Sequence, residues 1–290
     1  QAGSCGYRDK KLSYMNSYII MDRQAIIKLE TAGRDHVLKR YNHYAVISNA
    51  ITLTNDWDAS SLPPGTDFSK LSDPLMTYFA GGAFRRDRNQ DCIAGAKEGL
   101  GVTDVFAMLR SHYADSPATG FNRDVCMHAS DPLIRRSQTT GSMVVELHPD
   151  DKFRIFVTGG SAPCLTVFKP FLPALPFKDL SFGGGSYADD SYWWRHEAYH
   201  VNAVLRYETV RPLAQDRIAE SEAQWTAYFP AHAWDSTDPL LIEMSHDAFM
   251  ESESREKTLM AQMKGMKQSA GGLSPSFWKR VARRCGVPMV

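Results

Sequence analysis

The sequence has no excess of charge of either sign and no long hydrophobic run. Its 290 residues include 33 basic and 33 acidic side chains, so the formal net charge is zero. A balanced charge provides no general electrostatic attraction to nucleic acid or to an anionic membrane surface. No apolar run approaches the roughly 18 residues that a membrane-spanning helix needs. We therefore expect no nucleic-acid partner and no membrane partner.

Cysteine is scarce and scattered along the chain. The five cysteines are Cys5, Cys92, Cys126, Cys164 and Cys285, and none of them forms a Cys-x-x-Cys pair. An odd count without that spacing argues against a disulfide framework and against a cysteine zinc site. We expect a protein of the reducing cytoplasm that has no cofactor.

The composition is that of an ordinary soluble globular protein, with 43% hydrophobic and 23% charged residues. A chain of this length can form one large domain, and we expect a single domain over residues 1–290. Residues 1–180 are expected to be mainly β with one helix at 98–113, and residues 187–290 mainly helical. Strands followed by helices, rather than alternating with them, indicate an α+β fold.

Short β-branched and aromatic runs with polar breaks predict the strands of the first half. An antiparallel meander is expected from strands at 17–21, 25–30, 36–41 and 45–48. A hairpin is expected from strands at 143–147 and 153–157, and the proline-rich segment 163–177 is expected to wrap without pairing. In the second half, helices are expected at 189–227, 238–268 and 275–284, broken near Pro212, Pro230 and Pro239.

Four short sequence blocks follow one another in a characteristic order. They are Asn16-Ser17, Leu29-Glu30-Thr31-Ala32-Gly33-Arg34, Ile47-Ser48-Asn49-Ala50-Ile51-Thr52 and Arg136-Ser137-Gln138-Thr139-Thr140-Gly141-Ser142-Met143. In this order the blocks resemble the secernin and dipeptidase-A branch of the N-terminal-nucleophile hydrolases, which is related to the penicillin acyltransferase-like proteins. The Trp193-Trp194-Arg195-His196-Glu197 block adds to the resemblance. It implies an αββα sandwich of two antiparallel sheets, and hydrolysis or acyl transfer at an amide C–N bond of a small peptide or an acylated amine.

The resemblance also implies roles for single residues. Amide cleavage by a terminal thiolate needs donors for the tetrahedral oxyanion. Asn49 resembles the oxyanion-side Asn of bile-salt hydrolases, and Arg136 resembles the late Arg of those enzymes; Arg135 is the alternative to Arg136. We expect Asn49 and Arg136 to lie in one cleft. The ordinary alternatives are an Asn that caps a loop and an Arg in a surface ion pair.

Further residues of the blocks have candidate roles in binding or in structure. The candidate substrate contacts are Asn16, Ser17, Ser137 and Gln138, with strand-end hydrogen bonding as the alternative for the first two. Glu30 and Arg34 flank a Gly turn, a spacing that predicts a structural ion pair between them.

The nucleophile is the point at which the sequence departs from the family. Enzymes of this kind use the first residue of the mature chain, usually Cys, whereas this sequence opens on Gln1-Ala2-Gly3. We expect the nucleophile segment to lie outside this sequence and the 290-residue chain alone to have no dipeptidase or penicillin acylase activity. An incomplete fold would also expose a sheet edge and favour a homodimer.

Two cysteines are alternative nucleophiles. Cys5 would need cleavage after Ser4 to become terminal, and Cys126 would share one face of a strand with His128. The alternative for Cys126 is simple core packing.

A rival motif, His196-Glu197-Ala198-Tyr199-His200, matches the His-Glu-x-x-His zinc signature. On a helix, the two imidazoles would share a face, Glu197 would be the general base and Glu220 the third ligand. A zinc metallopeptidase is therefore the alternative function. A catalytically inert binding or structural protein is the second alternative. We expect no metal at this motif, because a similar block occurs without metal in secernin-like sequences.

Overall fold

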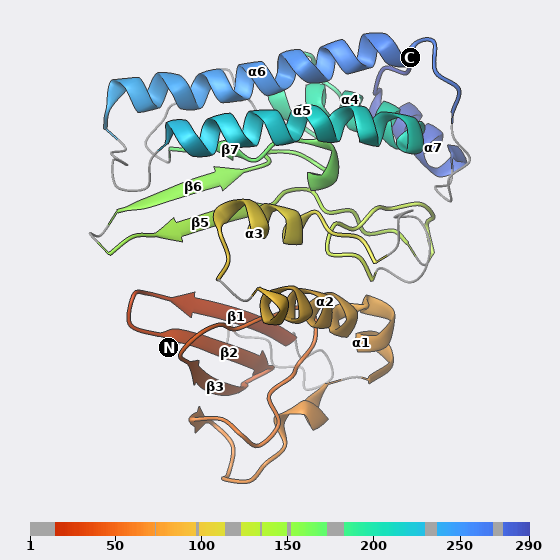
Figure 1. Cartoon of the computed structure of the whole chain (residues 1–290). Coiled ribbons are helices and arrows are strands. Elements are labelled where there is room, and N and C mark those ends of the chain that lie inside the picture. The colour runs from red at the N-terminus through yellow and green to blue at the C-terminus, as the bar shows by residue number, and fades with distance from the viewer. Residues whose placement is uncertain are drawn as a thin grey trace. The chain divides into compact units, whose positions relative to one another are not determined.

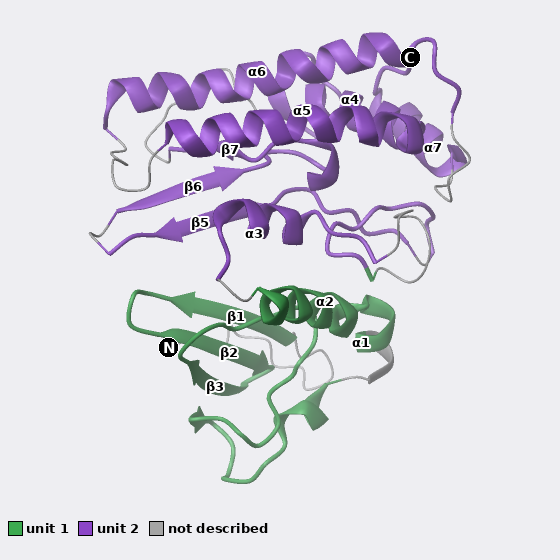
Figure 2. Cartoon of the chain, viewed as in Figure 1, with its two compact units in different colours: residues 1–97, 121–123 green, residues 98–120, 124–290 purple. Residues whose placement is uncertain are grey.

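A computed structural model describes residues 15–72, 74–96, 99–113, 123–133, 135–149, 152–172, 183–229, 237–268 and 275–290. The chain divides into two compact units (Figure 2). Unit 1 is residues 1–97 with 121–123, and unit 2 is residues 98–120 with 124–290. The sequence predicts a single domain because no linker-like composition marks residue 97, and the division appears only in the pattern of contacts. Each unit is described by itself below.

Unit 1 contains an antiparallel sheet in the order β1-β2-β3-β4. Its strands are β1 (Met15–Met21), β2 (Ile26–Ala32), β3 (Asp35–Tyr41) and the two-residue β4 (Ala59–Ser60). The first three form the predicted meander, in which Ser17 pairs with Glu30 and Glu30 with Val37. The strand predicted at 45–48 is wrong, because this segment is irregular and is held by side chains rather than by a strand ladder.

The sheet of unit 1 has a partly polar buried face. On β2 the side chains of Lys28, Glu30 and Ala32 are buried and alternate with partly exposed positions. A small apolar cluster around Val37 and Phe68 covers Ala32. β1 is an edge strand, and its residues 18–21 are exposed although all are apolar or aromatic.

Unit 1 also contains helices that the sequence patterns do not predict. They are the 3-10 helix η1 (Phe68–Leu71), α1 (Pro74–Ala80) and α2 (Gly82–Gly95). α2 lacks a clear apolar stripe, which is the signal that periodicity analysis needs. Arg85 of α2 is buried, and its guanidinium donates to the Ala80 carbonyl at 2.7 Å.

Unit 2 contains a second antiparallel sheet, formed by β5 (Met143–Leu147), β6 (Phe153–Val157) and β7 (Lys169–Pro170). The β5–β6 hairpin has the predicted bounds. The expectation that segment 163–177 makes no pairing is wrong at β7, where Phe156 pairs with Pro170 and Val157 with Lys169. β7 is an edge strand, and there Pro170 needs no partner for an N–H. The rest of that segment, residues 173–177, lies outside the described residues.

The helices of unit 2 are α3 (Val102–Leu109), η2 (Pro163–Leu165), α4 (Tyr192–Val204), α5 (Tyr207–Tyr228), α6 (Pro239–Met263) and α7 (Pro275–Cys285). The helical second half is thus confirmed, but the first long helix breaks at residues 205–206 and not at Pro212, which lies inside α5. Helices cover both faces of the second sheet. Phe156 packs on Phe106 of α3, whereas the next residue, Val157, packs on the opposite side against Phe249 of α6. Figure 1 shows α3 on one side of the β5–β6 hairpin and α6 on the other.

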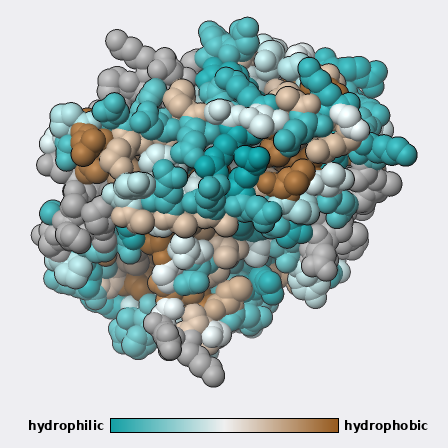
Figure 3. All heavy atoms as spheres, turned by 45° about the horizontal axis from the view of Figure 1, so that its top comes forward, coloured by the Kyte–Doolittle hydropathy of each residue, from teal (hydrophilic) through white to brown (hydrophobic). Residues whose placement is uncertain are grey.

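Two small antiparallel sheets accompanied by helices make the fold mixed α+β, as predicted. The upper part of the face shown in Figure 3 is mainly hydrophilic, with hydrophobic side chains in small separate groups. Across the described ranges, every helix is too short or too polar to cross a lipid bilayer.

Candidate functional site

A buried carboxylate in unit 1 fixes the segment that carries Asn49. Glu30 of β2 is fully buried, and its Oε2 atom accepts hydrogen bonds from the backbone N–H groups of Thr52 and Leu53, both at 2.9 Å. Lys28, on the same face of β2, lies 3.1 Å from Glu30 and donates to the Val46 carbonyl at 3.3 Å. An ion pair on one strand therefore holds the irregular segment 46–53 at both ends. The predicted ion pair between Glu30 and Arg34 is wrong, because Glu30 pairs with Lys28 instead.

Ser17 and Asn49 belong to the same arrangement. The Ser17 hydroxyl lies within 3.5 Å of Glu30 and donates to the Ala50 carbonyl at 3.4 Å. Asn49 itself is exposed, and its main chain lies against the start of α2 at Gly82. A Cβ atom at Gly82 would lie 2.6 Å from the Asn49 carbonyl oxygen, so only glycine allows this approach. Ser17 thus takes the strand-end hydrogen-bonding alternative, and Asn16 pairs opposite Thr31 in the sheet.

In unit 2 the Arg135 and Gln138 side chains hold the loop at 124–130. Arg135 is buried and lies 3.2 Å from the Asp124 carboxylate, and its guanidinium also donates to the His128 carbonyl. Gln138 accepts from the Ala129 N–H at 2.9 Å. Arg136 and Ser137, by contrast, are exposed. Asn49 belongs to unit 1 and Arg136 to unit 2, so their convergence in one cleft stays a prediction.

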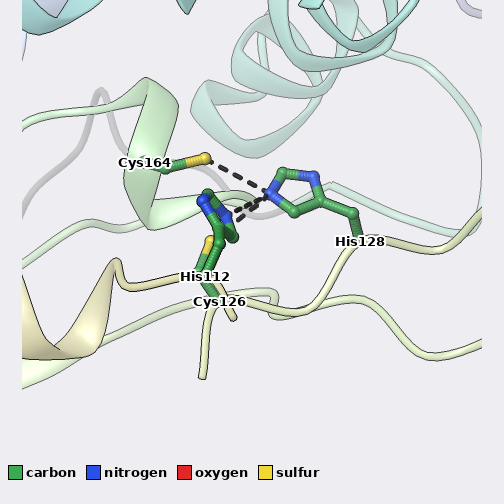
Figure 4. Close-up of side chains that lie close together, drawn as sticks. All are labelled: His112, Cys126, His128 and Cys164. Atoms are coloured by element: carbon green, nitrogen blue, oxygen red, sulfur yellow. Dashed lines mark hydrogen bonds between the residues drawn. The ribbon is translucent and has the colours of Figure 1, made fainter. Parts of the chain in front are cut away.

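Four metal-ligating side chains meet inside unit 2. His112 follows α3, Cys126 and His128 lie in the loop at 124–130, and Cys164 lies in η2 (Figure 4). Each offers one ligand atom, and these atoms all lie within 4.8 Å of one another. Among the described residues this is the one group of three or more such ligands. We call it the Cys/His cluster.

In the Cys/His cluster, the Nε2 atom of His128 lies close to a ligand atom of each of the other three residues. It is 3.2 Å from Nε2 of His112, 3.3 Å from Sγ of Cys164 and 3.5 Å from Sγ of Cys126. Tyr207 of α5 closes one side, because its hydroxyl lies 3.4 Å from Sγ of Cys164 and its ring meets the His128 ring edge to face at 5.4 Å. All of the cluster is buried except His112, which is partly exposed.

The two thiols of the Cys/His cluster differ in acidity. Burial raises the pKa of the Cys164 thiol, but hydrogen bonding with Cys126 and the nearby histidines outweighs burial and holds that pKa well below its ordinary value. Burial, together with the Cys164 sulfur, raises the pKa of Cys126 well above its ordinary value. Burial lowers the pKa of His128. A fully buried thiol with a raised pKa is a poor nucleophile, so this environment does not suit Cys126 as an attacking group.

The His-Glu-x-x-His motif lies on α4 and has a different environment. The Nδ1 atom of His196 is 3.0 Å from the Glu256 carboxylate, and its Nε2 is 2.8 Å from the Ser161 carbonyl oxygen. Both neighbours accept hydrogen bonds, so the ring must carry two protons and has no lone pair for a metal. Burial lowers the pKa of His196, but the Glu256 charge outweighs it and the pKa is raised.

The other residues of the zinc alternative are also engaged elsewhere. His200 Nδ1 lies 3.1 Å from Glu197, and burial raises the pKa of Glu197 while the His200 charge outweighs it and lowers that pKa to about 2. Glu220 is largely exposed and pairs with Arg255. Within the described ranges the ligand atoms of His196, His200 and Glu220 form no group that could hold a metal.

The sequence pattern pointed to Cys126 and His128, but as a possible nucleophile and its neighbour rather than as metal ligands. It gave no sign of His112 or Cys164. The available signal was the Cys-x-His spacing, which places two ligands side by side in a loop as well as on a strand. Cys5, the other nucleophile candidate, lies outside the described residues. No family model, characterised protein or solved structure matches the chain, so the arguments for its sites rest on these residues and their geometry.

Proposed function

We propose that this protein cleaves amides or transfers their acyl groups, acting on the C–N bond of a small peptide or an acylated amine by the N-terminal-nucleophile mechanism. The observation that supports this best is the way Asn49 is presented. Its side chain is exposed, while its main chain is fixed by the Glu30-held segment and by Gly82. The complete αββα sandwich of that superfamily belongs to the same proposal.

A fixed and unpartnered amide is the group that oxyanion stabilisation requires. The carbonyl oxygen of an amide becomes an oxyanion when a thiolate attacks, and donors that are already in place need no rearrangement at that moment. Asn49 is exposed, so its amide N–H is accessible to substrate. The buried Lys28–Glu30 pair holds the segment 46–53 that carries Asn49 in place. Exposed Arg136 is the candidate for holding a substrate carboxylate.

The test uses the protein expressed from its complete reading frame, incubated with a panel of dipeptides and acylated amines. We expect release of the free amine. Intact mass spectrometry of the quenched reaction should find the protein mass increased by one acyl group, which replaces a thiol hydrogen. Prior alkylation of accessible thiols should abolish both signals.

Two results would count against this function. Absence of both amine release and acyl adduct across the panel would favour an inert binding protein. Turnover that persists after alkylation would favour chemistry without a cysteine nucleophile, such as that of a metallopeptidase.

A further inference from the structure

We propose that His112, Cys126, His128 and Cys164 bind one zinc ion, in a closed structural site inside unit 2. The inference is independent of the amide-cleaving function, because it concerns how this unit is held together. It departs from the expectation that the protein has no cofactor, and it proposes zinc at a place other than the His-Glu-x-x-His motif.

The distances within the Cys/His cluster agree with zinc coordination. Zinc–sulfur bonds of about 2.3 Å and zinc–nitrogen bonds of about 2.0–2.1 Å make a tetrahedron with edges of roughly 3.3 Å between nitrogens and roughly 3.6 Å between nitrogen and sulfur. The nitrogen–nitrogen distance from His112 to His128 is 3.2 Å, and the nitrogen–sulfur distances from His128 are 3.3 and 3.5 Å. These three edges match those of a tetrahedral zinc site, and the other three edges are at most 4.8 Å.

Hydrogen bonding alone does not account for the contacts of His128. The Nε2 atom of His128 faces three other polar atoms, yet an imidazole nitrogen has either one proton or one lone pair. Hydrogen bonding can satisfy one of those contacts at a time. A cation at the centre is bound by one lone pair of each imidazole and by both thiolates at once, which satisfies all four ligand atoms.

The ligand types in the Cys/His cluster indicate zinc in a structural role. Two sulfurs and two imidazole nitrogens in a tetrahedron are a zinc ligand set, and four protein ligands leave no open position for a substrate. The ligands come from three separate segments: the end of α3, the loop at 124–130 and η2. Zinc binding would therefore join three segments that belong to different elements of the fold.

Neighbouring side chains hold these segments in place around the Cys/His cluster. The indole N–H of Trp278 on α7 donates to the Ala129 carbonyl at 2.9 Å, next to His128. Arg110, two residues before His112, donates to the Pro163 carbonyl at 3.2 Å, next to Cys164. The ligands are thus held from both sides, as a preorganised site requires.

The first experiment measures zinc per chain in protein purified without chelators, with Cys164→Ser as the variant and Cys285→Ser as the matched control. We expect about one zinc in the wild type and in the control, and less than ~0.1 in Cys164→Ser, because a lost ligand weakens the site strongly. Chelation of the wild type should lower its Tm. One zinc retained by Cys164→Ser would overturn the proposal.

A second variant keeps the test decisive if Cys164→Ser does not fold. His112→Cys replaces one ligand by another, so it should still bind one metal ion. With cobalt(II) in place of zinc, the thiolate-to-cobalt charge-transfer absorbance should rise by about half, because three sulfurs replace two. Wild type that binds neither zinc nor cobalt, or that contains a Cys126–Cys164 disulfide after purification under reducing conditions, would contradict the site.

Discussion

Replacing Glu30 by alanine should destabilise unit 1 and release the segment that carries Asn49. Glu30 is fully buried and is paired with Lys28, whose side chain is 5% exposed. Removing one partner of a buried ion pair costs about 3–5 kcal/mol because the other charge remains buried without compensation. The Thr52 and Leu53 N–H groups lose their acceptor as well, and each unsatisfied group costs about 1–3 kcal/mol.

The sharpest assay is amide hydrogen exchange read at Thr52 and Leu53, alongside urea unfolding. In Glu30→Ala both amides should exchange much faster than in the wild type. The double variant Lys28→Met/Glu30→Leu removes both charges, so it should recover part of the lost stability but not the protection of the two amides. An Asp87→Ala variant is the control, because Asp87 is exposed and is paired with its neighbour Arg86 on the same helix. Destabilisation below about 1 kcal/mol, with both amides still protected, would refute the reasoning.

Two further predictions concern unit 2. Gly160→Ala should lower the free energy of unfolding by about 1–3 kcal/mol, because the added Cβ would lie 2.2 Å from the ring of His196. The control is Gly185→Ala, whose added Cβ would meet open space. Thermal unfolding compares the two variants, and equal Tm values would contradict the tight contact at Gly160. Lys169 is fully buried, and burial lowers its pKa to about 8 although Glu256 and Glu222 oppose this. Below that pH it is charged in both the folded and the unfolded state, and above it only the unfolded state keeps the proton. The unfolding free energy of the wild type minus that of Lys169→Met should therefore rise by up to about 1.4 kcal/mol per pH unit between about pH 8 and 10, and a flat difference would show that Lys169 is not perturbed.

The sequence predicts the regular parts of the fold well where a pattern is long enough to read. The β1–β3 meander and the β5–β6 hairpin have clear alternation and clear turns. Strands β4 and β7 are two residues long, too short to show any alternation. Residues 45–48 are β-like in composition, but they are irregular, and the Val46 carbonyl accepts a hydrogen bond from Lys28 of β2 instead of pairing in a sheet.

The candidate sites divide along the same line. The Ser17, Glu30 and Asn49 blocks are each local, and the structure brings them together at one sheet. The Cys/His cluster combines ligands from three segments with spacings unlike those of zinc motifs, so only the Cys126-x-His128 pair was visible. The His-Glu-x-x-His match was misleading for the opposite reason: its local spacing is right, but His196 is paired with Glu256, which is distant in sequence and close in space.

The most direct test of the proposed function is the turnover of Asn49→Ala, in the protein from its complete reading frame, on the best amide substrate of the panel. Loss of an oxyanion donor should lower kcat by about 10²–10³-fold and leave KM nearly unchanged, because the donor acts on the transition state. Asn42→Ala is the matched control, since Asn42 is also exposed in unit 1 but lies outside the Glu30-held segment. Equal kcat values for wild type and Asn49→Ala would contradict the account.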